Sequence, residues 1–452
     1  MFEPGDEDPI YTSVRGTLAA CSDGVSYVAV SGGSDSLALA FIAAKAAAAC
    51  QDVTLRLVHV NHHLQPAADA WARQVRKVAE SLRVPLDILS VSVDENRGGG
   101  QEEAARAARY RAIAGLVDAE RDQVLTAHHR GDQAETVLLR LVRGAGVEGL
   151  GAMAPESWSH GFRLVRPWLD IDPELLKKVT GAAGLNPVSD PSNSDDWQFD
   201  RAFVRHQVLP LLSTRWPQAA TAIARSASQH REATDTLTRL AQRLLQHCQG
   251  ADPWQLSRER VRTLPSEDAM LLLRHWFKTR GARSPGAARL AEITRQALTT
   301  DLPGEHLQFA WDGYVLRNYR TTLYFERDIA RDDTLPRTWD CSTGDELTLS
   351  HGRLLVERRM GSGLRLPMGR QVTLNYRRDG ERVKNGATED RPGHQSLKKL
   401  MQTLGVPPWL RHSLPLVYIN DEVAVIPGHR TLGPWAAAAD EEGWVFSWEP
   451  VC

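Results

Sequence analysis

The feature that most constrains the fold is a regular alternation of strand-like and helix-like segments over the first ~145 residues. The strand-like runs are rich in β-branched residues, and each is followed by a helical pattern. The runs cover residues 25–30, 53–60, 86–93 and 123–127, and the helical patterns cover 36–49, 67–83, 101–120 and 132–143. This alternation predicts βαβ units in a parallel sheet, whose ligands bind at the carboxyl ends of the strands.

The rest of the chain divides into two further parts. A long amphipathic pattern over 221–249 precedes more helical patterns over 259–298, which predicts an all-α middle domain. After Asp301 short strand patterns return, punctuated by Gly, Pro and Asp, with one helix at about 394–404. We therefore predict an α/β parallel-sheet nucleotide-binding domain at residues 1–215, a mainly helical middle domain at 216–330 and an α+β C-terminal domain at 331–452.

Composition and charge favour a cytoplasmic protein. Of the 452 residues, 42% are hydrophobic and 24% are charged, and 54 Lys and Arg nearly balance 56 Asp and Glu. The five cysteines form no CxxC pair, which is typical of a reducing compartment. The N-terminal segment is acidic where a signal peptide is basic, and the most apolar tract, residues 37–50, is shorter than the ~20 residues that cross a bilayer. We therefore expect no membrane partner.

The strongest local motif is a strand that runs into a turn of serine and glycine and then into a helix, where residues 31–36 read SGGSDS. The two glycines let the backbone approach an anion, and the amides of the turn and the helix N-terminus point toward it. An aspartate suits such a site when Mg²⁺ bridges its carboxylate and the phosphate oxygens. The alternative is an ordinary turn in which Ser34 or Asp35 caps the helix. The expected phosphate-binding residues are Ser31, Gly32, Gly33, Ser34, Asp35 and Ser36, with Asp35 as the metal ligand.

A second group of candidates follows the fourth strand-like run, in LTAHHRGDQAET (125–136). Asp132 and Glu135 are three residues apart, so both carboxylates project from one helix face. Together they suit an amine or a second cation, whereas the alternative is that Asp132 caps the helix and Glu135 is solvated. His128 and His129 are candidate contacts for a nucleotide or a leaving group, and their alternative is a structural or surface role.

A third candidate is the predicted helix that begins near Gln101, on which Arg106 and Arg109 share a face. Two guanidinium groups at this spacing suit the recognition of phosphate or carboxylate. The alternative is an exposed helix on which glutamates and arginines pair with each other.

Basic residues gather in the C-terminal part of the chain. Between Arg353 and Arg411 there are 13 Lys and Arg against 5 Asp and Glu, a net charge of +8 within a chain of net charge −2. Phosphate contacts with RNA are expected where such charge concentrates. Lys398 and Lys399 begin a predicted helix there, and the alternative is a solvated basic face with Trp409 in a small core.

These motifs resemble those of known families. SGGSDS resembles the PP-loop of N-type ATP pyrophosphatases, which cleave ATP between the α- and β-phosphates and adenylate a substrate. Longer runs are together similar to the tRNA(Ile)-lysidine synthetase family in its long, three-domain form. These runs are HVNHHL (59–64), GQEEAARAARYRAI (100–113), LTAHHRGDQAETVLLRLVRGAGVEGLGAM (125–153), DPSNSDDWQFDRAFVRHQVLPLL (190–212) and GHQSLKKLMQTLGVPPWLRHSLPLVYINDEVAVIPG (393–428).

The resemblance implies a carbon–nitrogen ligase that uses ATP and Mg²⁺. ATP would adenylate the 2-oxo oxygen of the wobble cytidine in isoleucine tRNA with a CAU anticodon, and pyrophosphate would leave. The ε-amine of free L-lysine would then attack carbon 2 and expel AMP, so that lysidine forms and the tRNA reads AUA. The alternatives are another PP-loop tRNA-modifying enzyme, such as a thiolation enzyme, and a non-catalytic tRNA-binding protein. The sequence leaves the oligomeric state open, with a homodimer as one option.

The resemblance also implies a role for each candidate residue. The SGGSDS loop would hold the ATP phosphates, with Asp35 on Mg²⁺, and Asp132 and Glu135 would bind free lysine. The remaining implied contacts are Arg109, and less directly Arg106, at the nucleotide phosphate or the adenylated intermediate, His128 at the reacting groups, and Arg205, Lys398, Lys399 and Arg411 at the tRNA.

Two positions depart from the family's usual pattern. The family usually reads His-His-x-Asp-Asp-Gln-Ala-Glu-Thr, and here Gly131 stands in place of the first Asp. The family often has Arg-Asn where this chain has Arg201-Ala202, so a hydrogen bond made by that Asn would be missing. Neither departure removes an acid of the implied site, so activity is still expected.

Overall fold

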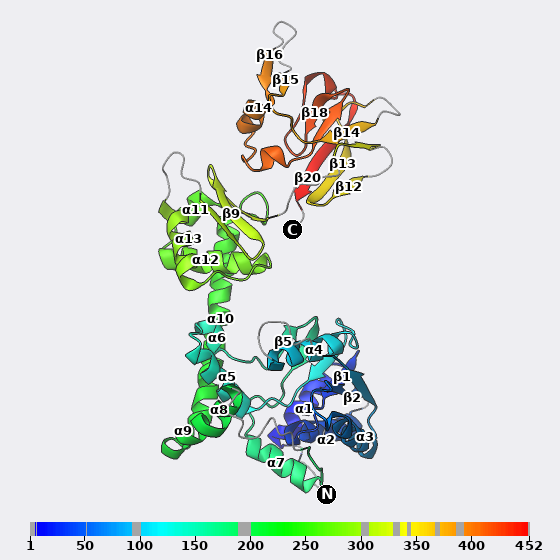
Figure 1. Cartoon of the computed structure of the whole chain (residues 1–452), viewed down its shortest axis with the longest axis vertical. Helices are drawn as coiled ribbons and strands as arrows, with labels where there is room; N and C mark the ends of the chain where they lie inside the picture. The colour runs from blue at the N-terminus through cyan, green and yellow to red at the C-terminus, as the bar shows by residue number, and fades with distance from the viewer. Residues whose placement is uncertain are drawn as a thin grey trace. The chain divides into compact units, whose positions relative to one another are not determined.

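The computed structural model describes residues 5, 7–50, 52–92, 101–188, 200–299, 307–328, 335–340, 345–366, 371–385 and 393–450 (Figure 1). The chain folds into two compact units, Met1–Thr236 and Leu237–Cys452. The predicted three-domain division is finer than these two units and stays a prediction. The segment 94–100, which follows the third strand-like run, and residues 190–199 of the family-like run lie outside the described residues.

The first unit is built on a six-stranded sheet in the order β3-β2-β1-β4-β6-β5. Its strands are β1 (Val25–Ala29), β2 (Thr54–Asn61), β3 (Leu86–Ser90), β4 (Gln123–Leu125), β5 (Glu156–Ser159) and β6 (Phe162–Val165). All neighbours pair in parallel except β5 with β6 at one edge. The predicted parallel sheet is therefore confirmed, and the hairpin β5–β6 is an addition that the sequence pattern did not indicate.

Helices cover both faces of this sheet (Figure 1). They include α1 (Pro9–Ala19), α2 (Ser34–Ala48), α3 (Ala68–Leu82), α4 (Gln101–Ala114), α5 (Arg130–Val142) and α7 (Pro173–Ala182). Neighbouring strand residues face opposite sides, because Val28 packs with α1, α2, α3 and α7, whereas Tyr27 packs with α4. Burial on both faces explains why the strands read as continuous apolar runs.

The first unit continues through short helical segments into a helix of 30 residues. These elements are α6 (Val147–Leu150), α8 (Asp200–Phe203), the π-helical turn η2 (Val204–Val208), α9 (Leu209–Arg215) and α10 (Ala219–Cys248). The predicted long helix over 221–249 is thus confirmed. No described helix combines the length and apolar character of a membrane span.

The second unit begins with helices packed against a small antiparallel sheet. The helices are α11 (Arg258–Arg262), α12 (Ser266–Thr279) and α13 (Ala287–Thr299), and the sheet has the order β7-β10-β9-β8, with β7 (Gln255–Ser257), β8 (Gln308–Trp311), β9 (Tyr314–Tyr319) and β10 (Thr322–Arg327). Trp276 and Phe277 of α12 pack on Phe325 of β10 in a shared core. The helices predicted over 259–298 are confirmed. The expectation of an all-α middle domain is wrong, because residues of the β7-β10-β9-β8 sheet form part of the same core.

The remainder of the second unit is α+β, as predicted. A five-stranded sheet has the order β11 (Arg337–Trp339), β14 (Val372–Asn375), β17 (Leu416–Ile419), β18 (Glu422–Ile426) and β19 (Arg430–Thr431). A three-stranded sheet has the order β12 (Glu346–Leu349), β13 (Gly352–Met360) and β20 (Glu442–Pro450). A third, two-stranded sheet pairs β15 (Arg382–Asn385) with β16 (Gly393–Ser396). Short helices are α14 (Leu397–Thr403), η3 (Leu410–His412) and η4 (Gly433–Trp435). The predicted helix near 394–404 is α14.

Within the second unit, aromatic and charged side chains of the two parts meet around Trp409. Its indole N–H donates to Glu326 Oε2 at 2.8 Å, and the guanidinium of Arg317 lies 5.3 Å from its ring centroid. Arg411 donates from Nη2 to the hydroxyl of Tyr319 at 3.0 Å. We call these five residues the tryptophan joint.

Candidate active site

The serine–glycine loop (residues 31–36) leaves β1 and enters α2 beside the point where the strand order reverses. Gly32 has a φ of +95°, and a Cβ there would lie 2.6 Å from Val188 Cγ2, so only glycine fits. α2 follows Gly33 without a side-chain cap. The N–H groups of its first turn therefore retain the capacity to bind an anion.

The polar side chains of the loop surround this helix start. The hydroxyls of Ser31 and Ser36 lie 3.2 Å apart, and Ser34 Oγ donates to Thr180 Oγ1 at 3.1 Å. Asp35 is in the first turn of α2, and its side chain is 36% exposed, so a ligand can reach it. The loop thus fits the predicted phosphate site.

The carboxylates of Asp132 and Glu135, the acid pair, are buried on α5 with residue exposures of 8% and 2%. Each accepts from two arginines. Arg201 donates from Nε to Glu135 Oε2 at 2.8 Å and from Nη2 to Asp132 Oδ1 at 2.9 Å. Arg205 donates from Nε to Glu135 Oε1 at 2.6 Å and from Nη2 to Asp132 Oδ1 at 3.1 Å. The acid pair and this arginine pair form a four-charge cluster, in which the acids are buried and the guanidiniums are partly exposed.

The arginine pair comes from α8 and the π-helical turn η2, which follow residues that the structure does not describe. Burial alone would lower the pKa of both guanidiniums, but the two carboxylates outweigh burial and raise it. Burial alone would likewise raise the pKa of Asp132, yet His129 and Arg201 lower it. These pKa shifts favour the charged forms of Asp132, Arg201 and Arg205.

His129 joins the cluster to the serine–glycine loop. Its Nδ1 accepts from the backbone N–H of Gly131 at 3.1 Å and of Asp132 at 3.4 Å, which caps α5. Its Nε2 lies 3.5 Å from Asp35 Oδ2 and 3.5 Å from Asp132 Oδ2. Asp132 completes a capping box by accepting from the His129 backbone N–H at 3.0 Å. The predicted capping role of Asp132 and its predicted ligand role therefore coexist.

His128 and Arg109 lie at the same carboxyl edge of the sheet. His128 Nδ1 is 2.8 Å from Thr126 Oγ1, and burial lowers its pKa to about 3, so the imidazole is neutral at physiological pH. Arg109 donates from Nε to His62 Nε2 at 3.4 Å, just beyond β2. Burial and the Arg109 charge lower the pKa of His62 to about 4, so His62 accepts as a neutral ring.

Arg106 is directed elsewhere than Arg109. Its guanidinium lies 4.9 Å from the ring centroid of Tyr110, and the residue is exposed. Arg106 therefore keeps only a peripheral place in the site.

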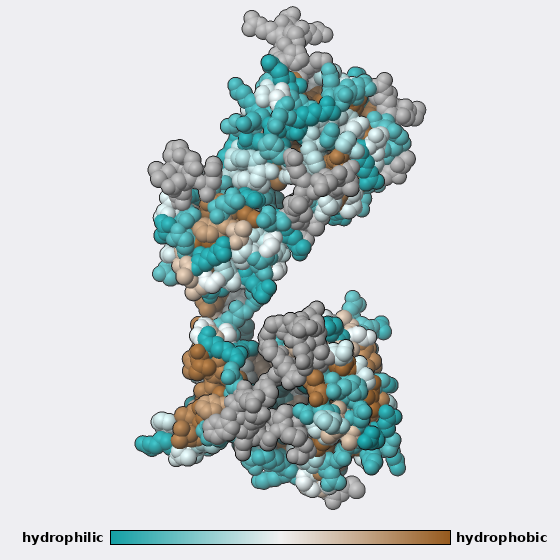
Figure 2. Space-filling model, in the orientation of Figure 1, coloured by the Kyte–Doolittle hydropathy of each residue, from teal (hydrophilic) through white to brown (hydrophobic). Residues whose placement is uncertain are grey.

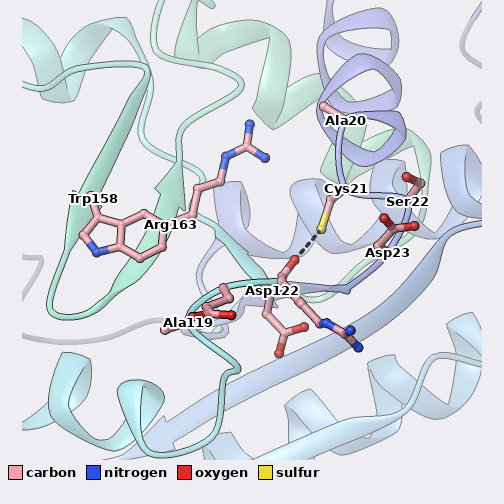
Figure 3. Close-up of a pocket in the computed structure, with 10 residues that line it drawn as sticks. Ala20, Cys21, Ser22, Asp23, Ala119, Asp122, Trp158 and Arg163 are labelled. Atoms are coloured by element: carbon pink, nitrogen blue, oxygen red, sulfur yellow. Dashed lines mark hydrogen bonds between the residues drawn. The ribbon is translucent and has the colours of Figure 1, made fainter.

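A cavity of about 580 Å³ opens at the opposite edge of the sheet (Figure 3). Asp23 and Asp122 line it; Asp122 directly precedes β4, and Asp23 comes two residues before β1. The cavity therefore lies at the amino ends of the strands, and none of the predicted site residues lines it. Trp158 and Arg163 of the β5–β6 hairpin form another of its walls.

The predicted tRNA contacts of the second unit differ in exposure. Lys398 and Lys399 are exposed on α14. Arg411 is only 8% exposed, and it donates from Nε to the Val406 carbonyl at 2.9 Å in addition to its bond with Tyr319. This placement argues against Arg411 as a phosphate contact, because both bonded edges of its guanidinium face the protein interior.

The residues at the loop fit Mg²⁺ only together with a phosphate ligand. Mg²⁺ in phosphate sites is held by one or two carboxylates and by phosphate oxygens, and Asp35 offers one carboxylate beside the loop. The described residues contain no group of three or more His, Cys, Asp and Glu arranged to hold a metal ion. The ion would therefore come with the nucleotide.

One member of the site, Arg201, was not among the predicted candidates, whereas His129 was a candidate together with His128. Arg201 and Arg205 are four apart, so they share a helix face, as Asp132 and Glu135 do. Matching these two spacings of opposite charge was the available signal for Arg201. The capping contact of His129 was not predicted, because it depends on the ring folding back over its own helix.

Family models match three segments of the chain. The PP-loop domain matches residues 12–212, the TilS substrate binding domain matches 256–324, and the TilS substrate C-terminal domain matches 372–448. The three matches lie in the parts that the sequence assigned to the nucleotide-binding, middle and C-terminal domains.

Curated relatives extend the match to nearly the whole chain. The tRNA(Ile)-lysidine synthase of Methylococcus capsulatus is 37% identical over 432 residues, which cover 94% of this chain and 96% of the relative. That of Bordetella pertussis is 43% identical over 307 residues, covering 66% of this chain and 95% of the relative, and that of Coxiella burnetii is 32% identical over 94% and 93%. These matches confirm the resemblance that the motifs indicated, and the chain belongs to the tRNA(Ile)-lysidine synthase family.

Proposed function

We propose that this chain ligates L-lysine to carbon 2 of the wobble cytidine in isoleucine tRNA with a CAU anticodon, forming lysidine at the expense of ATP. The observation that carries the proposal is the meeting, at His129, of a phosphate-binding loop and a buried cluster of two acids and two arginines. Nucleotide chemistry and amino-acid binding then share one edge of one sheet.

The serine–glycine loop holds the ATP phosphates in this proposal, and Asp35 holds Mg²⁺ with them. ATP supplies an adenylate at the 2-oxo oxygen of the cytidine, and pyrophosphate leaves. The chain contributes mainly positioning and charge neutralisation, because the adenylate already provides the leaving group. Arg109 is placed to contact the nucleotide phosphate or the adenylated base, and neutral His128 can accept or share a proton without adding positive charge.

Free lysine is a zwitterion at its α-carbon, and the four-charge cluster offers the complement of both charges. Every charge of the cluster is paired within the chain in this structure. A ligand with one charge would leave a buried acid or guanidinium unpaired, which is costly. Lysine instead places its α-ammonium on the acid pair and its α-carboxylate on the arginine pair. Its ε-amine then remains as the nucleophile for carbon 2.

This arrangement changes the role proposed for Arg205. The resemblance implied a contact with RNA, but its guanidinium reaches both members of the acid pair. We assign Arg205 to the lysine carboxylate. The exposed Lys398 and Lys399 of α14 remain the proposed phosphate contacts for the tRNA.

The test is incorporation of radiolabelled lysine into unmodified isoleucine tRNA(CAU) with ATP and Mg²⁺, beside methionine tRNA of the same anticodon. Incorporation into the isoleucine tRNA alone supports the proposal and shows discrimination beyond the anticodon. No incorporation, with pyrophosphate still released, would point to another adenylated base. No incorporation and no pyrophosphate, with the tRNA bound, would identify a non-catalytic binder.

A second copy of the chain is a proposed partner. Figure 2 shows apolar surface over α5, α6 and α8, and an apolar surface that large is typical of a contact site. Sedimentation of the purified chain across a concentration series would show a dimer if this surface pairs two copies. The exposed apolar residues on these three helices are Leu141, Val142, Val147 and Phe203.

A further inference from the structure

We propose that His129 is a positioning residue that couples the nucleotide site to the lysine site, and that Gly131 is the residue that permits this. The inference rests on the proposed function, because it concerns how the two sites of that reaction influence each other. It starts from a single imidazole ring that contacts the loop aspartate and one member of the acid pair.

The hydrogen bonds of the ring fix its tautomer. Nδ1 accepts from two backbone N–H groups at the start of α5, so it carries no proton. The proton of the neutral ring is therefore on Nε2, which faces the carboxylates of Asp35 and Asp132 at equal distances of 3.5 Å. One edge of the ring thus faces two acids, one from each of the two proposed sites.

Sharing of this proton makes the two sites compete for it. When Asp35 binds the cation of a bound nucleotide, the Nε2–H group of His129 donates a hydrogen bond to Asp132 alone. Asp132 is then better oriented beside Glu135 for an ammonium group. By linkage, lysine on the acid pair must favour nucleotide binding by the same factor.

Gly131 is what gives the ring its position. A Cβ at residue 131 would lie 2.9 Å from Cε1 and 3.1 Å from Nδ1 of His129. A side chain there requires the ring to shift by a few tenths of an ångström, and the shift changes the position of Nε2 relative to Asp35. The family's usual pattern has the same two histidines, so this chain differs in the space that Gly131 leaves for the ring of His129.

The experiment measures binding, by calorimetry on the full chain, of L-lysine with and without a non-hydrolysable ATP analogue and Mg²⁺. Four proteins are compared: wild type, His129→Asn, Gly131→Ala and the double variant. Asn is a strong N-cap, so His129→Asn keeps the cap of α5 but is too short to reach Asp35. We expect the analogue to tighten lysine binding in wild type, and each single variant to lose that coupling and about tenfold in affinity for the analogue with Mg²⁺.

The double variant separates positioning from a structural role. If Gly131 acts only through the ring, Gly131→Ala adds no further loss in the His129→Asn background. The thermal midpoint should stay near wild type in His129→Asn, and Gly131→Ala should not lower it, since Ala is the better helix former. Coupling retained in both single variants overturns the inference. A wild-type chain that binds neither lysine nor the analogue overturns the proposed function itself.

Discussion

The four-charge cluster of the first unit and the tryptophan joint of the second unit both place arginines beside a glutamate, but they treat its charge differently. Glu135 accepts from two guanidiniums at 2.6 to 2.9 Å. Glu326 has one distant arginine, with Arg317 Nη1 at 3.5 Å, and one indole N–H at 2.8 Å. Burial accordingly raises the pKa of Glu326 to about 7.

This difference distinguishes a ligand site from a structural contact. Full internal pairing keeps four charges available in a buried place, where a ligand with matching charges can replace the internal partners. The carboxylate of Glu326 has too few partners for a ligand to replace. Its burial favours the protonated, neutral form, which packs among the aromatic side chains of the tryptophan joint at little cost. Replacing Glu135 by glutamine should therefore weaken ligand binding, whereas replacing Glu326 by glutamine should stabilise the fold.

The largest expected effect follows Glu135→Gln. The change leaves Arg201 and Arg205 with Asp132 as their one carboxylate partner in the cluster. It also removes a buried carboxylate from the proposed ammonium site, and such a loss costs about 2–5 kcal/mol in comparable buried pairs. The KM for lysine should rise by at least about 30-fold, while the KM for ATP changes less than about threefold. Steady-state kinetics with each substrate varied in turn provides the measurement. Glu174→Gln, on the exposed surface of α7, is the matched control, and equal effects of the two variants would return Glu135 to a structural role.

Glu326→Gln should stabilise the chain, with a pH dependence. Because its folded pKa of about 7 lies above the ordinary value of 4.5, the stability contributed by Glu326 is present below about pH 4.5 and is lost as the pH rises to about 7. Gln stays neutral throughout, so the variant should gain at most about 3 kcal/mol over wild type above pH 7 and nothing near pH 4.5. Calorimetric unfolding of both proteins across this pH range checks the difference. A constant difference would mean that Glu326 is charged throughout.

Arg411→Ala should destabilise the second unit without changing the salt dependence of tRNA binding. It removes hydrogen bonds to the Val406 carbonyl and the Tyr319 hydroxyl and should cost about 2 kcal/mol of unfolding free energy. Thermal unfolding and filter binding at several salt concentrations measure the two properties. A flattened salt slope with unchanged stability would restore Arg411 as a phosphate contact.

The smallest effect is expected from Lys398→Ala combined with Lys399→Ala. Both side chains are exposed, so the thermal midpoint should remain near wild type. Loss of two phosphate contacts should weaken tRNA binding and reduce the slope of log affinity against log salt by about 1.5 to 2. An unchanged slope would mean that the tRNA phosphates contact a surface other than α14. Lys177→Ala on α7 serves as the control for the loss of a positive charge elsewhere on the chain.

The sequence predicted the sheet and most helices because local periodicity determines them. The alternation of strands and helices predicted β1 to β4, and the spacing of Asp132 and Glu135 predicted a shared helix face. The hairpin β5–β6 was missed because its strands have only four residues each and lie in a segment rich in Pro and Asp.

The pairing of the acid pair with arginines could not be predicted from the sequence, for a different reason. Arg205 contacts Glu135 across 70 residues of sequence, and its position depends on how α8 and η2 return to α5. The burial of Arg411 was not predicted, because a basic region in sequence does not reveal which guanidinium turns inward. Tertiary packing, which no local pattern encodes, decided both cases.

The central claim is that the four-charge cluster takes up lysine as a zwitterion, and lysine analogues test it most directly. Calorimetry would compare L-lysine with cadaverine, which lacks the carboxylate, and with 6-aminohexanoate, which lacks the α-amine, each in the presence of an ATP analogue and Mg²⁺. Each analogue leaves one buried charge unpaired, so both should bind at least about tenfold more weakly than lysine. Cadaverine or 6-aminohexanoate binding as tightly as lysine would contradict the account.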